Sequence, residues 1–142
     1  MANLSKSKYI TYCQCPKALW LKQYKSEEMV IDPLMQARFD AGTEVGELAK
    51  RLFGDFVEAT TYKTAADGTQ RLDLGAMAAA TQKALAEGAE NIAEAAFIYD
   101  GCYCAVDLLH KTPHGYAIYE VKSSTDLKEL EVYAQDVAYQ KY

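Results

Sequence analysis

The order of its periodic segments most constrains how this 142-residue chain can fold. Helix signals dominate the first 88 residues, with a candidate short strand at residues 55–60 and a turn at 64–70, and they return near residue 126. Residues 95–99, 102–110 and 116–123 have the composition of strands. Asp100-Gly101 and residues 112–115 supply the two turns between these strands. This order predicts an α+β fold whose central, mostly antiparallel β-meander is flanked by helices.

Capping residues mark where the helices should begin. Ser5 and Pro16 predict two short helices over residues 4–24, Asp32-Pro33 opens a longer helix to about Phe53, and residues 73–87 form an Ala-rich helix. A last helix should start at Asp126, where Glu129 completes a capping box. Apolar side chains at helical spacing predict buried stripes in two of these helices: Phe39, Val45, Leu48 and Leu52 in one, and Leu127, Leu130, Ala134, Val137 and Ala138 in the other.

The charge is distributed unevenly along the sequence. The first 25 residues carry five lysines and no acid, whereas the remainder carries 10 basic and 20 acidic residues. The formal net charge of -5 argues against a wholly basic nucleic-acid binder. The length and the 50% hydrophobic content indicate one globular domain over residues 1–142. Because the sequence contains neither a signal-peptide core nor a membrane span, we expect a cytoplasmic protein.

Acidic residues interrupt two neighbouring predicted strands, where charge is costly unless it is paired or bound to metal. Asp107 lies within the apolar run 105–109, and Glu120 and Lys122 share one face of the next strand. Two carboxylates brought together by a hairpin are suited to Mg²⁺ or Mn²⁺, and a nearby lysine could orient a metal-bound water. Alternatively, these residues form ordinary ion pairs at a solvent-exposed edge.

Several motifs together resemble the RecB-like branch of the PD-(D/E)XK nuclease superfamily. Asp107 with Glu120-Val121-Lys122 resembles its D-(x)n-E-x-K core, and residues 135–139 resemble the Q-x-x-x-Y motif that follows. Residues 42–48 resemble the first-helix motif G-x-x-x-H-E. The N-terminus, with residues 4–9 and Cys15-Pro16-Lys17, resembles the iron–sulfur members of the branch, which include CRISPR adaptation nucleases.

The resemblance implies a restriction-endonuclease-like core and a role for each matched residue. Asp107 and Glu120 would bind the metal together with the carbonyl of Val121 and with Glu47, and Lys122 would position the attacking water. Gln135 and Tyr139 would line the site and contact DNA. The implied function is an exonuclease-like, Mg²⁺- or Mn²⁺-dependent deoxyribonuclease acting on single-stranded DNA or duplex ends.

The sequence also departs from the family pattern. Gly46 replaces the histidine of the first-helix motif, and Cys15 matches one cluster cysteine while the other three are not found. A further strand expected after the Q-x-x-x-Y helix is missing as well, which suggests a partial domain or a homodimer in which a second copy completes the sheet.

The N-terminal segment 1–25 allows two interpretations. Its lysines and aromatic residues, among them Lys6, Lys8, Tyr9, Lys17 and Lys22, could follow a phosphate backbone and stack on bases. Alternatively, the aromatic residues form a helical core face and the lysines its solvated side. Two other functions stay open beside the nuclease: a non-cleaving nucleic-acid-binding or assembly module of the same fold, and a small iron–sulfur or thiol protein.

Overall fold

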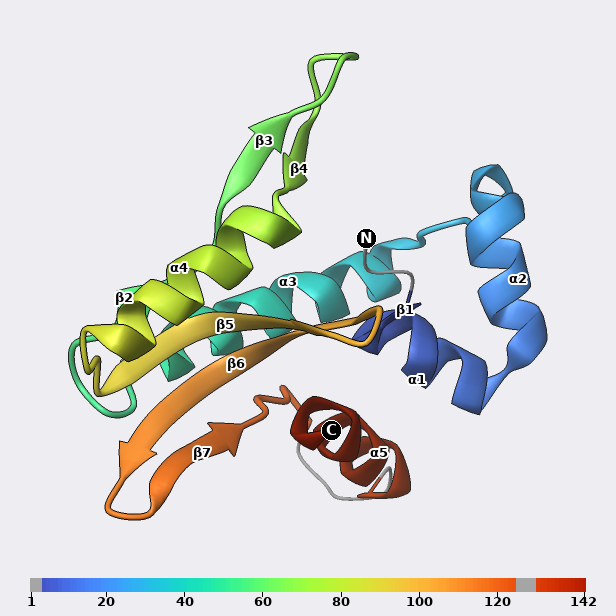
Figure 1. The fold of residues 1–142 in the computed structure, drawn as a ribbon. Coiled ribbons are helices and arrows are strands. Elements are labelled where there is room, and N and C mark those ends of the chain that lie inside the picture. Colours follow the sequence, from blue (N-terminus) through green and yellow to red (C-terminus); the bar gives the residue numbers. More distant parts are fainter. Residues whose placement is uncertain (1–3, 125–129) are drawn as a thin grey trace.

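The structure is a computed structural model that describes residues 4–124 and 130–142. A mixed sheet lies at the centre, and helices surround it (Figure 1). Its long middle strand, β6 (Cys102–Thr112), pairs antiparallel with β5 (Asn91–Tyr99) on one side and with β7 (Gly115–Tyr119) on the other. The protein is therefore of mixed α and β class, and the predicted β-meander is confirmed.

Two very short strands extend this meander. β1 (Leu4–Ser5) runs parallel to the start of β6, on the side where β7 pairs further along, and β2 (Val57–Glu58) runs parallel to β5. β2 lies inside the short strand that the sequence indicates at residues 55–60, whereas β1 was not predicted. β1 matters for the site because it fixes the beginning of the described chain against the central strand.

The helices begin where their capping residues predict. They are α1 (Lys6–Gln14), α2 (Pro16–Tyr24), α3 (Pro33–Ala49), α4 (Leu74–Ala86) and α5 (Leu130–Lys141), with a short 3-10 turn η1 (Ser26–Glu28). Ser5, Asp32 and Asp73 each accept a hydrogen bond from the backbone three residues ahead. α3 ends at Ala49, earlier than expected, and the predicted capping box at residues 126 and 129 lies outside the described residues.

The hydrophobic core lies between α4 and the sheet. Ile92, Val106 and Met77 are almost completely buried there. Thr81 of α4 joins the two layers, because its hydroxyl accepts a hydrogen bond from the backbone of Ala96 at 2.8 Å and donates one to the carbonyl of Met77 at 3.0 Å. A buried polar group with both bonds satisfied costs little, and this one holds α4 in register on β5.

The buried stripes expected on two helices are wrong, except that Val45 is half-buried and that Leu127 lies outside the described residues. Phe39, Leu48 and Leu52 are more than half exposed, because no described element covers the outer side of the segment from α3 to residue 52. On α5, Leu130 is 59% exposed and the inward side carries polar residues instead. Apolar spacing identified the helices correctly but not the side that each turns to the protein.

A hairpin of β3 (Tyr62–Thr64) and β4 (Gln70–Leu72) projects from the body beyond α4 (Figure 1). Asp67 at its tip is held by Thr69 and Arg71. Among the described residues, no helix has both the length and the apolar character needed to cross a membrane.

Candidate functional site

Two acidic side chains face each other in the middle of the sheet. Ala93 and Ala95 pair with Leu108 and Val106, so the residues between them, Glu94 and Asp107, occupy opposite positions on β5 and β6. Both are half-buried. Among the described residues, neither carboxylate has a cationic side chain within ion-pair distance.

Glu94 has an unusual backbone and an unfavourable environment for its charge. Its φ is +54°, a region that L-residues rarely adopt inside a strand, so this part of β5 is locally distorted. Burial raises the pKa of Glu94, and the nearby charge of Asp107 raises it further. A bound cation would relieve both effects.

Asp107 also holds the segment that carries the predicted E-x-K residues. Its Oδ2 accepts a hydrogen bond from the backbone N–H of Val121 at 2.7 Å. β7 ends at Tyr119, so Glu120 and Lys122 lie beyond the strand in which the sequence placed them, and this hydrogen bond holds their backbone beside β6. The structure thus brings Asp107, Val121 and their neighbours together, as the D-(x)n-E-x-K spacing predicts.

Glu120 and Lys122 belong to a compact charged cluster with two side chains of α5. Lys122 Nζ contacts Glu120 Oε1 and lies 2.8 Å from Asp136 Oδ2. Gln140 donates to Glu120 Oε2 at 2.6 Å and to Asp136 Oδ1 at 3.1 Å. The two carboxylate side chains are only 7% and 9% exposed, so these contacts are shielded from water.

Lys6 of α1 completes this cluster from the other end of the sequence. Its Nζ lies 2.9 Å from Glu120 Oε2 and 3.5 Å from Asp136 Oδ1. We call Lys6, Glu120, Lys122, Asp136 and Gln140 the charged cluster. The sequence predicted that Lys6 would contact nucleic acid; the structure directs it to a predicted metal ligand.

The charges of the cluster stabilise one another. Burial disfavours the charged form of Lys122, but its hydrogen bonds to Asp136 and Glu120 outweigh this effect and raise its pKa. The pKa of Lys6 is raised in the same way, because contact with Glu120 outweighs burial. Burial would raise the pKa of Asp136, but the hydrogen bond from Lys122 prevails and lowers it. All three groups are therefore ionised at neutral pH.

The Q-x-x-x-Y motif indicated one pair of side chains of α5 for the site, but the structure buries another pair. Gln135 is exposed, whereas Asp136 and Gln140, four residues apart on one face, are buried against Glu120. Tyr139 lies at the edge of this contact and donates from its hydroxyl to the carbonyl of Leu4 at 2.9 Å. Burial, followed by its interaction with Cys102, raises the pKa of Tyr139 to about 12, which keeps the phenol neutral.

α3 forms one wall of a hollow of about 520 Å³ in front of these residues. The helix contributes Gly42, Gly46 and Glu47, and the sheet side contributes Glu94, Asp107, Glu120, Val121 and Lys122. The carboxylate of Glu47, a predicted metal ligand, is 64% exposed and lies 2.7 Å from Lys50 Nζ. Lys50 also pairs with Glu58 of β2 at 2.8 Å, so one ammonium group is shared by two carboxylates at the rim of the hollow.

A second hollow, of about 600 Å³, shares Glu94 and Asp107 with the first. Residues of β1 and α1 line it on one side, and Tyr62 and Leu72 of the projecting hairpin line it on another. The two acidic side chains therefore border both hollows, which gives an elongated ligand room on each side of them.

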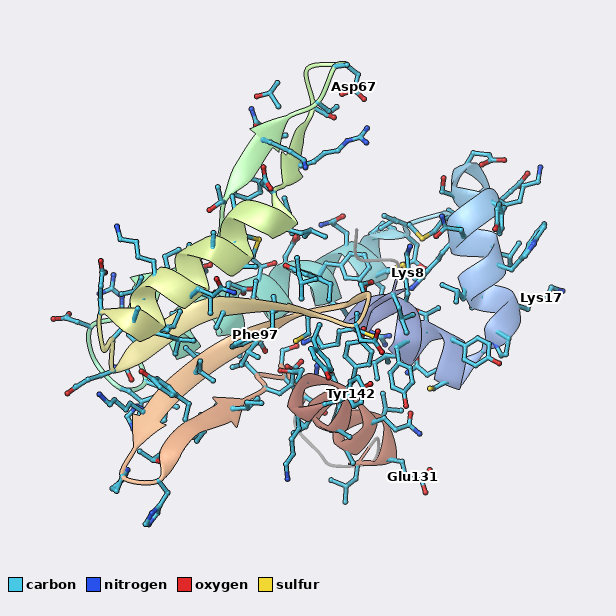
Figure 2. The ribbon with its side chains drawn as sticks, viewed as in Figure 1. Lys8, Lys17, Asp67, Phe97, Glu131 and Tyr142 are labelled. Carbon is cyan, nitrogen blue, oxygen red and sulfur yellow. The ribbon has the colours of Figure 1, made fainter. Side chains whose placement is uncertain are left out.

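The other predicted binding residues lie farther from the charged cluster. Lys22 donates to Thr11 at 3.3 Å, Tyr9 stacks on Tyr139 with 5.0 Å between ring centroids, and Lys8 is half-buried. Figure 2 shows Lys17 on the outer side of α2, directed away from the sheet. Cys13 and Cys15 are exposed and Cys104 is buried. Within residues 4–124 and 130–142, no three His, Cys, Asp or Glu side chains gather closely enough to hold a metal ion.

Sequence reasoning missed Glu94, Asp136 and Gln140. Glu94 carries the same signal as Asp107, an acid within the apolar run 91–99, but the strand was expected to begin at residue 95. Asp136 and Gln140 give no such signal, because the inward face of α5 depends on how the helix docks. Comparisons of the chain with protein-family models, with curated proteins and with solved structures gave no match.

Proposed function

We propose that this chain is a metal-dependent nuclease domain of the RecB-like PD-(D/E)XK type, hydrolysing phosphodiester bonds of DNA. One observation carries the proposal: the acids Glu94 and Asp107 line a hollow without forming an ion pair with any described residue, and Asp107 holds the segment Glu120–Lys122 beside them through Val121. A nuclease needs carboxylates for a cation and a lysine near the water that attacks phosphorus.

The donor set suits Mg²⁺ or Mn²⁺. Carboxylate and carbonyl oxygens are hard ligands, and opposed acids in a half-buried position favour a cation between them. Asp107, Glu120 and the carbonyl of Val121 would hold the ion, and Glu94 lines the same hollow. The bound ion would supply Lewis-acid polarisation of water and of the scissile phosphate.

The residues of the charged cluster have distinct roles in this proposal. Lys122 would position the attacking water, and its contacts with Glu120 and Asp136 restrict where its ammonium group can lie. Gln140 would orient Glu120 through its amide. Tyr62 of the projecting hairpin lines the larger hollow and offers aromatic surface on which unpaired bases could stack.

Cleavage of labelled oligonucleotides tests the proposal directly. Single-stranded and duplex DNA, with RNA of the same sequence, would be incubated with the pure protein in Mg²⁺, in Mn²⁺ and in EDTA. We expect metal-dependent DNA cleavage that is lost in Asp107→Asn and in Lys122→Met, whereas Lys83→Met, at an exposed position of α4, retains it. Activity that persists in both site variants, or in EDTA, would refute the assignment.

A non-cleaving nucleic-acid-binding module is the second candidate. It is favoured by the ion pair that turns Glu47 toward Lys50, and by Gly46 where the family motif has a histidine. For such a module we expect DNA binding without metal and no cleavage in either Mg²⁺ or Mn²⁺. The same oligonucleotide experiment separates the two functions.

A further inference from the structure

Lys6 contacts the predicted metal ligand Glu120 even though 114 residues separate them in the sequence. Its side chain is only 20% exposed, and of the five lysines in the first 25 residues it is the one whose ammonium lies in the charged cluster. Lys25 pairs with its neighbour Glu27 instead. The contact between Lys6 and Glu120 therefore belongs to the site and is not a general property of the basic segment.

The backbone around Lys6 is held in place on both sides. Leu4 and Ser5 pair with Cys102 and Tyr103 of β6, and the carbonyl of Leu4 accepts the hydroxyl of Tyr139. Ser5 then caps α1, which begins at Lys6 itself. Because the backbone is fixed, the ammonium can move only by rotation of the four-carbon side chain, which is flexible in lysine.

The charged cluster contains two carboxylates and two ammonium groups, so it is balanced as it stands. A divalent cation bound by Glu120 would make one ammonium surplus. Lys122 lies 2.8 Å from Asp136, whereas Lys6 lies 3.5 Å from it, so Lys6 has the weaker second partner. Lys6 also lines the larger hollow together with Glu94 and Asp107, so its ammonium already borders the space that a substrate would enter.

We propose that Lys6 is a positioning residue that exchanges partners: it holds Glu120 while no divalent cation is bound, and on cation binding it turns to a phosphate group of the nucleic acid. This inference rests on the proposed function, because it needs the cation site. It gives the N-terminal segment a specific role, in which one lysine couples occupation of the cation site to substrate binding.

Calorimetric titration with Mn²⁺ tests the first half of the exchange. The whole chain would be compared with Lys6→Met and with Lys17→Met, an exposed lysine of the same basic segment. Removing a charged hydrogen-bonding competitor for Glu120 should tighten Mn²⁺ binding roughly tenfold, and Lys17→Met should leave it unchanged. Equal or weaker Mn²⁺ binding by Lys6→Met would overturn the inference.

Binding of a single-stranded oligonucleotide tests the second half. Ca²⁺ would replace Mn²⁺ so that binding is measured apart from cleavage, and EDTA would provide the cation-free state. We expect Lys6→Met to weaken DNA binding in Ca²⁺ and not in EDTA, because only the released ammonium contacts phosphate. An equal loss in both conditions would make Lys6 an ordinary basic contact and would refute the exchange.

A second variant guards against misfolding. Lys6→Gln retains a donor for Glu120 without the positive charge, and we expect it to bind Mn²⁺ more tightly than the wild type while keeping its thermal unfolding temperature. The nuclease proposal can fail separately: tighter Mn²⁺ binding with no cleavage supports the exchange and refutes the nuclease. If neither the wild type nor Lys6→Met binds Mn²⁺, the exchange itself is refuted.

Discussion

Glu94 and Asp107 occupy matching positions on the two central antiparallel strands, between the pairs Ala93–Leu108 and Ala95–Val106, and the backbone of Glu94 is distorted there. Like charges directly across a strand pair repel. Charge of this kind in a half-buried sheet destabilises the fold unless a ligand compensates for it. The relationship therefore connects the architecture of the sheet to the proposed site more directly than any single motif does.

Glu94→Gln should stabilise the protein, and more so at neutral than at acidic pH. The native state raises the pKa of Glu94, so it binds this proton more tightly than the unfolded chain does. The free energy of unfolding of the wild type therefore falls as the pH rises from the ordinary pKa of glutamate toward the raised pKa of Glu94. The variant has no carboxyl group at this position and does not lose this stability. Thermal unfolding at pH 4 and pH 7.5 measures the difference. Glu44→Gln, exposed on α3, is the control, and a larger gain at pH 4 would contradict the prediction.

Asp136→Asn should destabilise the protein at neutral pH. The change leaves Lys122 and Lys6 with only Glu120 as an anionic partner, at a cost of about 1–3 kcal/mol. The folded state lowers the pKa of Asp136. The contribution of this carboxylate to the free energy of unfolding is therefore present at neutral pH and is lost as the pH falls through the lowered pKa. Chemical denaturation across this range measures the effect; a constant difference down to acid pH would argue against it.

The two glutamines of α5 should behave differently. Gln140→Ala removes the amide that contacts both Glu120 and Asp136. We therefore expect the free energy of unfolding to fall by about 1–2 kcal/mol and any nuclease activity to be lost. Gln135→Ala changes an exposed side chain and should leave stability within about 0.5 kcal/mol. Denaturation and oligonucleotide cleavage would be measured for both. A greater effect of Gln135→Ala on cleavage would restore the role that the Q-x-x-x-Y motif gives it.

Gly46 offers a test by gain of function. A Cβ added there meets no atom within 4 Å, and the residue lines the hollow that contains Glu94 and Asp107. Gly46→Ala should stabilise α3 by about 0.5–1 kcal/mol, because glycine is a poor helix former. Gly46→His should stabilise α3 less than Gly46→Ala does. It should, however, tighten Mn²⁺ binding by adding an imidazole ligand, which calorimetric titration measures. If alanine and histidine affect Mn²⁺ equally, the imidazole does not reach the ion.

Local signals in the sequence predicted the parts of the fold that depend on local chemistry. Ser5, Asp32 and Asp73 cap their helices as expected, because a capping side chain needs only a backbone N–H three residues away. The meander followed from strand composition and its turn residues. Which side of α3 and of α5 is buried could not be predicted in this way, because burial depends on which elements pack against each helix.

The site shows the same division. The spacing of Asp107 and residues 120–122 predicted their proximity, which the hydrogen bond to Val121 confirms. Lys6 and Gln140 reach Glu120 through the docking of α1 and α5, and no pattern within either segment specifies that contact. Their roles as ligands, as a lysine that orients water, or as contacts to DNA stay predictions.

Tyr139 and Leu4 are joined by a hydrogen bond across 135 residues, and this has a consequence for synthesis. A ribosome makes Lys6 well before Gln140. The charged cluster therefore cannot close on a nascent chain until α5 has emerged, whereas the β5–β6 hairpin can form earlier from neighbouring residues. During that interval Lys6 and Lys122 lack Asp136 as a partner, so the electrostatic balance of the charged cluster is among the last properties that this protein acquires.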